Sequence, residues 1–82
     1  MTGTRRVLPF NGAKLLSLRA RLGLRQQDLS DKTAENGRRV ERSTISRYEN
    51  GEATPSVLNF GALVRALGCK PDDLLDSEAP AA

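Results

Sequence analysis

Residues 43–51 carry side chains that could recognise a ligand from one side of a short helix; they read Ser-Thr-Ile-Ser-Arg-Tyr-Glu-Asn-Gly. At about 100° per residue, the polar side chains at positions 42, 43, 46, 47 and 50 fall within about 140° of one another. Thr44, Ile45 and Tyr48 point the other way. One face can therefore be buried while the other, with two guanidinium groups, two hydroxyls and one amide, suits the edge of a groove.

The sequence marks both ends of this helix. Val40 and Ile45 lie one residue before and four residues after a candidate cap at Glu41, which is the spacing of a hydrophobic staple. Gly51 can adopt the left-handed conformation that ends a helix. We therefore expect a helix over residues 42–49.

Charge is unevenly distributed along the 82 residues, although the net charge is only +3. Residues 1–47 hold eleven basic and four acidic residues, whereas residues 48–82 hold two and six. A basic half that carries a short polar helix is typical of a polyanion-binding protein. Taken alone, the same charge pattern also fits a solvated surface with chance clustering.

The composition argues against several other classes. There is no His, one Cys and no Gly-rich phosphate loop, so nucleophile and base pairs are lacking and we expect no enzyme, cofactor or metal. Cys69 alone cannot form an intramolecular disulfide, which favours a reducing cytosol. No apolar run approaches the length of a membrane span, so we expect a soluble cytoplasmic protein without a membrane partner.

The rest of the chain reads as an all-α domain of five short helices. Asn11 can cap a helix over about residues 12–22, in which Leu15, Leu18 and Leu22 recur at helical spacing. A second helix follows over about residues 26–35, and the third is the polar helix. Ser56 can cap a fourth, in which Val57, Phe60, Val64 and Leu67 define an apolar face that ends at Gly68. Pro71 begins a short fifth helix.

These elements divide the chain into three parts. Residues 1–9 are expected to form a flexible basic arm, residues 10–76 a compact domain, and residues 77–82 a disordered tail. Residues 36–39 form the turn before the third helix. No segment predicts a convincing strand.

The order of these features resembles the helix-turn-helix family of phage repressor and Cro proteins, or XRE family. The resemblance covers about residues 11–75 and rests on several short matches: Leu18, Arg19, Gly23, Leu24, Gln26, Leu29, Ser43 to Gly51, Pro55, Ser56, Ala66, Leu67 and Gly68. It implies a compact five-helix lambda-repressor-like fold, encoded by a bacterium or phage, in which helices two and three form the helix-turn-helix.

Three departures from the family pattern bear on the geometry. Ser30 stands where the family usually has Ala, and Arg25 stands where it has a Ser or Thr cap. The stretch from Ser30 to Val40 is about five residues longer than the usual turn of the family. Either the second helix gains a turn or the loop around residues 36 and 37 is enlarged.

The resemblance implies that the third helix reads DNA in the major groove while the second crosses the backbone. Candidates for base contacts are Arg42, Ser43, Thr44, Ser46 and Arg47. Candidates for phosphate contacts are Gln26, Arg25, Arg38, Arg39 and Asn50. Arg5 and Arg6 could enter a minor groove, or simply belong to a disordered tail.

Other roles concern the scaffold. By resemblance, Arg19 and Glu49 form a partly buried ion pair between the first and third helices. Tyr48 is expected in the core with its hydroxyl in water, and Cys69 is expected to be a buried inert thiol.

The resemblance favours a sequence-specific transcriptional regulator, a repressor, that binds a pseudo-palindromic operator in the nucleoid as a homodimer. The dimer surface is expected at Leu74, Leu75 and the fourth and fifth helices. The alternative is an antitoxin-type module that neutralises a partner protein through its acidic half and regulates its own operon. Non-specific nucleoid binding is a weaker variant.

Overall fold

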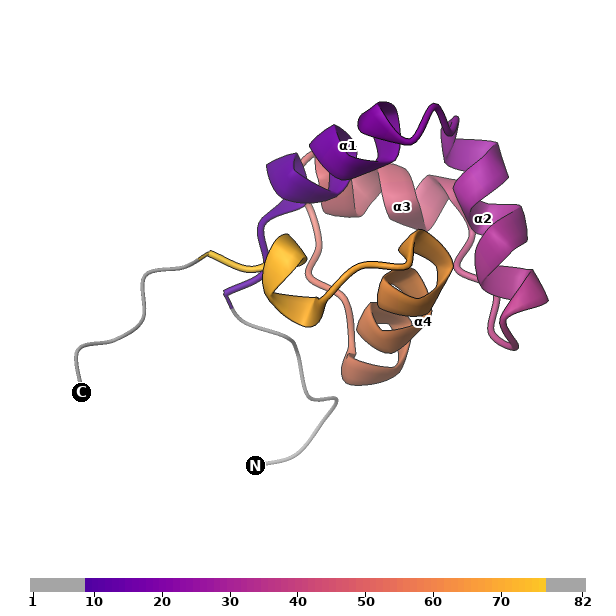
Figure 1. Cartoon of the computed structure of the whole chain (residues 1–82). Helices are drawn as coiled ribbons and strands as arrows, with labels where there is room; N and C mark the ends of the chain where they lie inside the picture. Colours follow the sequence, from indigo (N-terminus) through magenta and orange to yellow (C-terminus); the bar gives the residue numbers. More distant parts are fainter. Residues whose placement is uncertain (1–8, 77–82) are drawn as a thin grey trace.

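The computed structural model describes residues 9–76 and contains four α-helices and one 3-10 helix (Figure 1). In chain order these are α1 (Gly12–Arg21), α2 (Gln26–Glu35), α3 (Arg42–Glu49), α4 (Val57–Leu67) and η1 (Pro71–Leu74). Each lies where the sequence predicts a helix. The predicted arm residues Arg5 and Arg6, and the predicted tail 77–82, lie outside the described residues.

The prediction of five α-helices is wrong at the fifth element, which is a single 3-10 turn. Pro71 begins it, and the carboxylate of Asp73 accepts a hydrogen bond from the Lys70 N–H. Leu75 then takes an extended conformation and forms an isolated antiparallel bridge with Phe10. Because this bridge withdraws Leu75 from helical geometry, the turn cannot lengthen into an α-helix.

Three of the predicted helix boundaries have a visible cause. The Asn11 side chain accepts hydrogen bonds from the N–H groups of Ala13 and Lys14 and so caps α1. Ser56 caps α4 in the same way, and Gly68 ends it at φ 65°. Glu41 precedes α3 without a side-chain cap, so the start of α3 depends on packing.

The helices surround one small core. α1 packs against α3, while α2 packs against both α3 and α4. Five aliphatic side chains, one from each element, are completely inaccessible to water: Leu15, Leu29, Ile45, Leu63 and Leu74. The staple residue Val40 is also buried, which confirms that the start of α3 is held by apolar contacts.

The predicted apolar face of α4 is only partly correct. Leu67 is buried, and Phe60 and Val64 pack against the core, but Val57 is 54% exposed, and the buried residues of the helix also include Ala62, Leu63 and Ala66. This helix is apolar on nearly all sides, so its periodicity alone could not select the buried face. Leu22, the C-cap residue of α1, is likewise 49% exposed, so it does not extend the apolar face of Leu15 and Leu18.

The longer connection between α2 and α3 is a loop over residues 36–41 that folds back onto α2. The buried hydroxyl of Thr33 donates to the carbonyl of Ser30 and accepts a hydrogen bond from the Val40 N–H at 2.8 Å. Gly37 adopts φ 104°, which favours glycine. The end of the loop is therefore fixed against α2 where α3 begins.

The two ends of the described chain lie side by side (Figure 1). The Asn11 N–H donates to the carbonyl of Leu74, and the Asp76 N–H donates to that of Pro9. The Asn11 side chain also donates to the Asp76 carboxylate at 2.7 Å. Pro9, placed at the end of the predicted arm, is thus joined to the domain.

We expect Gly12→Ala to destabilise the fold by about 1–3 kcal/mol, the usual cost of overpacking. A Cβ at Gly12 would lie 2.0 Å from the backbone oxygen of Tyr48, so α1 and α3 would have to separate. Gly61→Ala is the matched control, because its Cβ meets only the flexible end of Arg65 at 3.3 Å. Urea unfolding measures both changes, and equal effects would contradict the close crossing.

Candidate nucleic-acid interface

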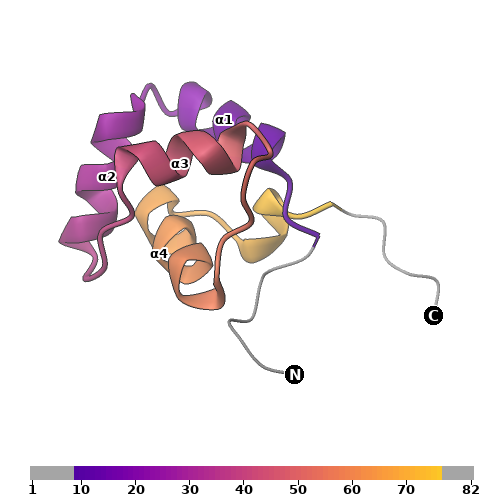
Figure 2. The same ribbon diagram turned by 180° about the vertical axis from the view of Figure 1, so that it is seen from behind.

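The helix α3 presents two distinct faces. Ile45, Tyr48 and Glu49 are buried, whereas Arg42, Ser43 and Arg47 are exposed. Figure 2 shows α3 lying across the face of the molecule turned towards the viewer. The structure therefore leaves both arginines of the predicted contact face in solvent.

The remaining predicted contact residues are Thr44 and Ser46, between the buried and exposed faces of α3, and Asn50, just after its C-terminal end. Thr44 and Ser46 are half-buried, so their short side chains face solvent only in part. Asn50 is exposed at the C-terminal end, where its backbone N–H donates to the Ser46 carbonyl. The exposed hydrogen-bonding residues of α3 are thus Arg42, Ser43 and Arg47.

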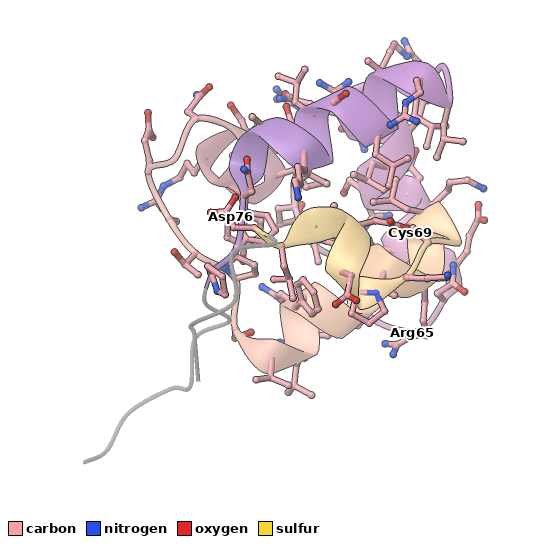
Figure 3. The ribbon with its side chains drawn as sticks, turned by 60° about the vertical axis from the view of Figure 1, so that its left-hand side comes forward. Arg65, Cys69 and Asp76 are labelled. Carbon is pink, nitrogen blue, oxygen red and sulfur yellow. The ribbon has the colours of Figure 1, made fainter. Side chains whose placement is uncertain are left out.

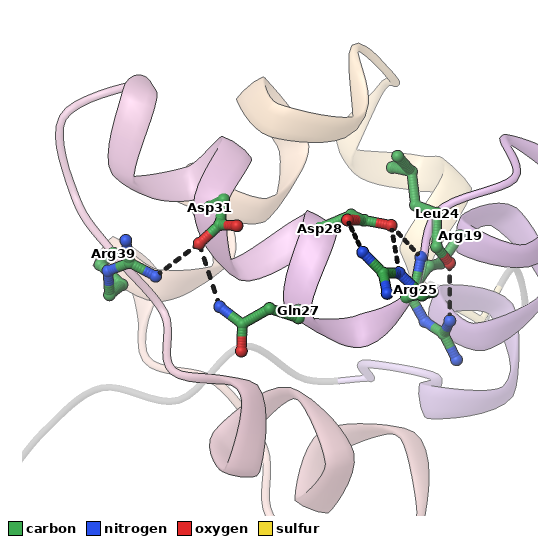
Figure 4. Close-up of polar contacts among 7 residues, drawn as sticks. All are labelled: Arg19, Leu24, Arg25, Gln27, Asp28, Asp31 and Arg39. Carbon is green, nitrogen blue, oxygen red and sulfur yellow. Dashed lines mark hydrogen bonds and ion pairs between the residues drawn. The ribbon is translucent and has the colours of Figure 1, made fainter.

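The predicted ion pair between Arg19 and Glu49 is present and joins α1 to α3. Arg19 Nε lies 2.6 Å from Glu49 Oε2, and Arg19 Nη2 lies 3.0 Å from Oε1. The Glu49 side chain is 1% exposed and that of Arg19 is 15% exposed. The hydrogen bonds to Glu49 raise the pKa of Arg19 above its ordinary value. Arg19 also donates from Nη1 to the Leu24 carbonyl (Figure 4).

Gln26 belongs to the same cluster. Its Nε2 donates to Glu49 Oε1 at 2.9 Å, so the buried carboxylate receives hydrogen bonds from α1 and from the first residue of α2. A side-chain amide has two N–H donors, and this bond uses one of them. The predicted phosphate contact at Gln26 would thus be made by an amide whose orientation is already set.

Two of the predicted phosphate-contact arginines pair with carboxylates on α2 (Figure 4). Arg25 is bonded to both oxygens of Asp28, which also accepts from the Arg25 N–H at 2.8 Å. These bonds lower the pKa of Asp28 to about 2. Arg39 donates to Asp31 at 3.1 Å and to the Ser30 hydroxyl at 2.9 Å. Hydrogen bonds from Arg39 and Gln27 lower the pKa of Asp31.

The third, Arg38, has a neutral partner. It lies exposed in the loop before α3, and its Nε donates to Asn59 Oδ1 on α4 at 2.8 Å. None of the ion pairs among residues 9–76 joins Arg38 to a carboxylate. The same holds for Arg42 and Arg47.

The structure adds to one scaffold prediction and corrects another. Tyr48 is buried as expected, and its hydroxyl oxygen accepts a hydrogen bond from Asn59 Nδ2 at 2.9 Å, a protein partner that the sequence did not indicate. Cys69, just after α4 in Figure 3, is only half-buried. Burial and the nearby Asp73 raise the pKa of its thiol, which keeps it protonated.

Sequence reasoning missed the partners of Arg25, Arg38 and Arg39. Arg25 and Asp28 stand three residues apart, a spacing that predicts a side-chain pair on a helix start. The contacts of Arg38 and Arg39 join positions whose meeting depends on the path of the loop, so no local spacing indicates them.

The described residues hold no group of three or more His, Cys, Asp or Glu side chains placed to bind a metal ion. Within residues 9–76, no helix is both long enough and apolar enough to cross a membrane.

We expect Glu49→Ala to lower the free energy of unfolding by about 3–5 kcal/mol, because it leaves the largely buried Arg19 without its partner. Urea unfolding of Glu49→Ala, Arg19→Ala and the double variant measures the coupling between the two side chains. The double variant should lose clearly less than the two single losses combined. Strictly additive losses would refute the ion pair.

Asp28 should remain ionised to unusually low pH, with an NMR titration midpoint at about 2. Because folding lowers this pKa, the contribution of the ionised carboxylate to stability is complete above its unfolded value of 3.8 and is lost as the pH falls towards 2. Arg25→Ala should move the midpoint upwards. An unchanged midpoint in that variant would show that Arg25 does not hold the carboxylate.

Comparison with known proteins agrees with this geometry. A family profile described as "Helix-turn-helix" matches residues 15–74, which span the core from α1 to η1. The crystal structure of the restriction-modification controller protein C.AhdI from Aeromonas hydrophila is similar, with a TM-score of 0.67 and 29% sequence identity over 76% of this chain and 86% of that chain. No curated protein matches the sequence. The chain belongs to the XRE-type helix-turn-helix family and is a DNA-binding transcription regulator.

Proposed function

We propose that this protein binds double-stranded DNA sequence-selectively, with α3 in the major groove and α2 across the phosphate backbone. The observation that carries the proposal is the orientation of α3. Glu49, at the C-terminal end of α3, is buried and bonded to Arg19 and Gln26. Arg42 and Arg47, on the same helix, face solvent. An arginine held on a rigid helix can bind the O6 and N7 atoms of guanine with two parallel hydrogen bonds.

The side chains of α3 differ in exposure, and this supports a different contact with the DNA bases for each of them. Arg42 and Arg47 are proposed to read guanine, and Ser43 to make a single hydrogen bond to a base edge. Thr44 and Ser46, which are half-buried, would contact only bases that approach the helix closely, such as a thymine methyl at Thr44.

The proposed backbone contacts flank α3. Gln26 would use its remaining N–H at the start of α2, where the helix N-terminus already favours an anion. Arg38 and Arg39 would contact phosphates from the loop before α3, with Arg25 and Asn50 at the margins of the surface. Such contacts set affinity and salt dependence, whereas sequence preference comes from base contacts.

We also propose that the protein acts as a dimer and a repressor. A single module of this size makes too few contacts for tight operator binding, and two modules on half-sites one helical turn apart supply the rest. Leu74 is fully buried in its own protomer, so it cannot be part of the dimer surface as predicted. Val57 and Leu58 at the start of α4 are 54% and 63% exposed and offer apolar area instead.

Selection of bound duplexes from a random library tests the function directly. We expect enrichment of a pseudo-palindrome with half-sites one helical turn apart. Recovery of bound DNA without any enriched motif would contradict selective recognition and leave non-specific binding as the function.

We expect Arg47→Ala to weaken binding to the selected site by about 1–3 kcal/mol and to relax preference at one base pair. Arg38→Ala should weaken binding to all duplexes alike and reduce the salt slope by about one. Fluorescence anisotropy titrations over a range of salt concentrations measure both. If the two outcomes were exchanged, the loop and not α3 would read the sequence.

A further inference from the structure

Asn59 on α4 is the meeting point of two side chains from other parts of the fold. Its Oδ1 accepts from Arg38 Nε at 2.8 Å, and its Nδ2 donates to the Tyr48 hydroxyl at 2.9 Å. Arg38 lies in the loop before α3, whereas Tyr48 lies on the buried face of α3. The side chain therefore links α4 both to the loop and to the DNA-reading helix.

The chemistry of the partners allows only one orientation of the Asn59 amide. A guanidinium group has donors and no acceptor, so the amide oxygen must face Arg38. The amide nitrogen then faces Tyr48, whose hydroxyl oxygen can accept a hydrogen bond whichever way its own proton points. The backbone is fixed as well, because the Asn59 N–H donates to the capping hydroxyl of Ser56.

This arrangement leaves part of the Arg38 guanidinium available. The bond to Asn59 uses Nε alone, and the terminal Nη1 and Nη2 groups carry four further N–H donors. Because Asn59 is neutral, it directs the guanidinium without cancelling its charge. Arg39, the next residue, is instead bonded to the Asp31 carboxylate.

We propose that Asn59 is a positioning residue that directs Arg38 at the DNA backbone, with the Tyr48 hydroxyl as its fixed support. Asn59 does not contact DNA in this scheme, since it acts through Arg38. The inference rests on the proposed function, to which it adds a residue on α4, outside the helix-turn-helix itself.

The test is a double-variant cycle on DNA affinity. Asn59→Ala keeps the backbone N–H that Ser56 caps, and Ala is a favourable helix residue, so we expect a folded protein. Its dissociation constants for the selected duplex and for an unrelated duplex should both rise about threefold to tenfold, the value of one hydrogen bond. The variant that combines Arg38→Ala with Asn59→Ala should bind no more weakly than Arg38→Ala alone.

Arg65→Ala is the matched control. It removes the same charge from an exposed position in the last turn of α4, near Cys69 in Figure 3. In the Arg65→Ala background, Asn59→Ala should still cause its full loss of affinity. Tyr48→Phe removes only the support of the amide, and we expect a smaller loss of the same kind that also vanishes in the Arg38→Ala background.

A measurement without DNA isolates the contact itself. The Arg38 Nε–H resonance should exchange more slowly with water in the wild type than in Asn59→Ala. Three results would each overturn the role of Asn59. They are equal exchange rates of the Arg38 Nε–H in the two proteins, an unchanged DNA affinity of Asn59→Ala, and a double variant whose loss of affinity is the product of the two single losses. A wild-type protein that binds no duplex would instead overturn the proposed function, and that result appears before any variant is made.

Discussion

Glu49 ends α3 with a carboxylate that is almost completely withdrawn from water. A buried charge is tolerated only when it is paired and hydrogen-bonded, and here the partners are Arg19 from α1 and Gln26 from α2. Three helices must therefore meet at one point, with little freedom in how they cross. The inner side of α3 is fixed by this requirement and by the burial of Ile45 and Tyr48. Its polar side is left outward as a consequence, which is the arrangement that a DNA-reading helix needs.

The helices could be predicted where local chemistry determines them. Asn11 and Ser56 cap their helices through short side chains, and the staple of Val40 and Ile45 marks the start of α3. Prediction failed where the outcome depends on tertiary partners. The buried face of α4 was predicted only in part, because that helix is apolar nearly all round: Leu67 is buried and Phe60 and Val64 pack against the core, but Val57 is exposed. The fifth element became a 3-10 turn because residues 10 and 75, far apart in sequence, pair across the fold.

In the candidate site, too, features set by local geometry could be predicted, whereas features set by tertiary contacts could not. Helical geometry alone placed Arg42 and Arg47 on one face, and both are exposed. The partners of Arg38 and Arg39 could not be predicted, because they depend on how the loop over residues 36–41 returns onto α2 and α4. Family resemblance supplied the pair of Arg19 and Glu49, but not the third member, Gln26. A residue taken for an independent phosphate contact is thus also part of the cluster that orients α3.

The basic residues around α3 are not electrostatically equivalent. Arg25 and Arg39 already face carboxylates, so a phosphate that approaches either must share it with Asp28 or Asp31, and the net charge it meets is close to zero. Arg38, Arg42 and Arg47 have no such counter-charge among the described residues. Counterion release depends on the phosphates that are neutralised, so Arg38, the one of these three that is proposed to contact a phosphate, should contribute more to the salt dependence than Arg25 or Arg39. Within the fold, Arg25 is bonded to Asp28 at the start of α2, and Arg39 joins the loop before α3 to Asp31.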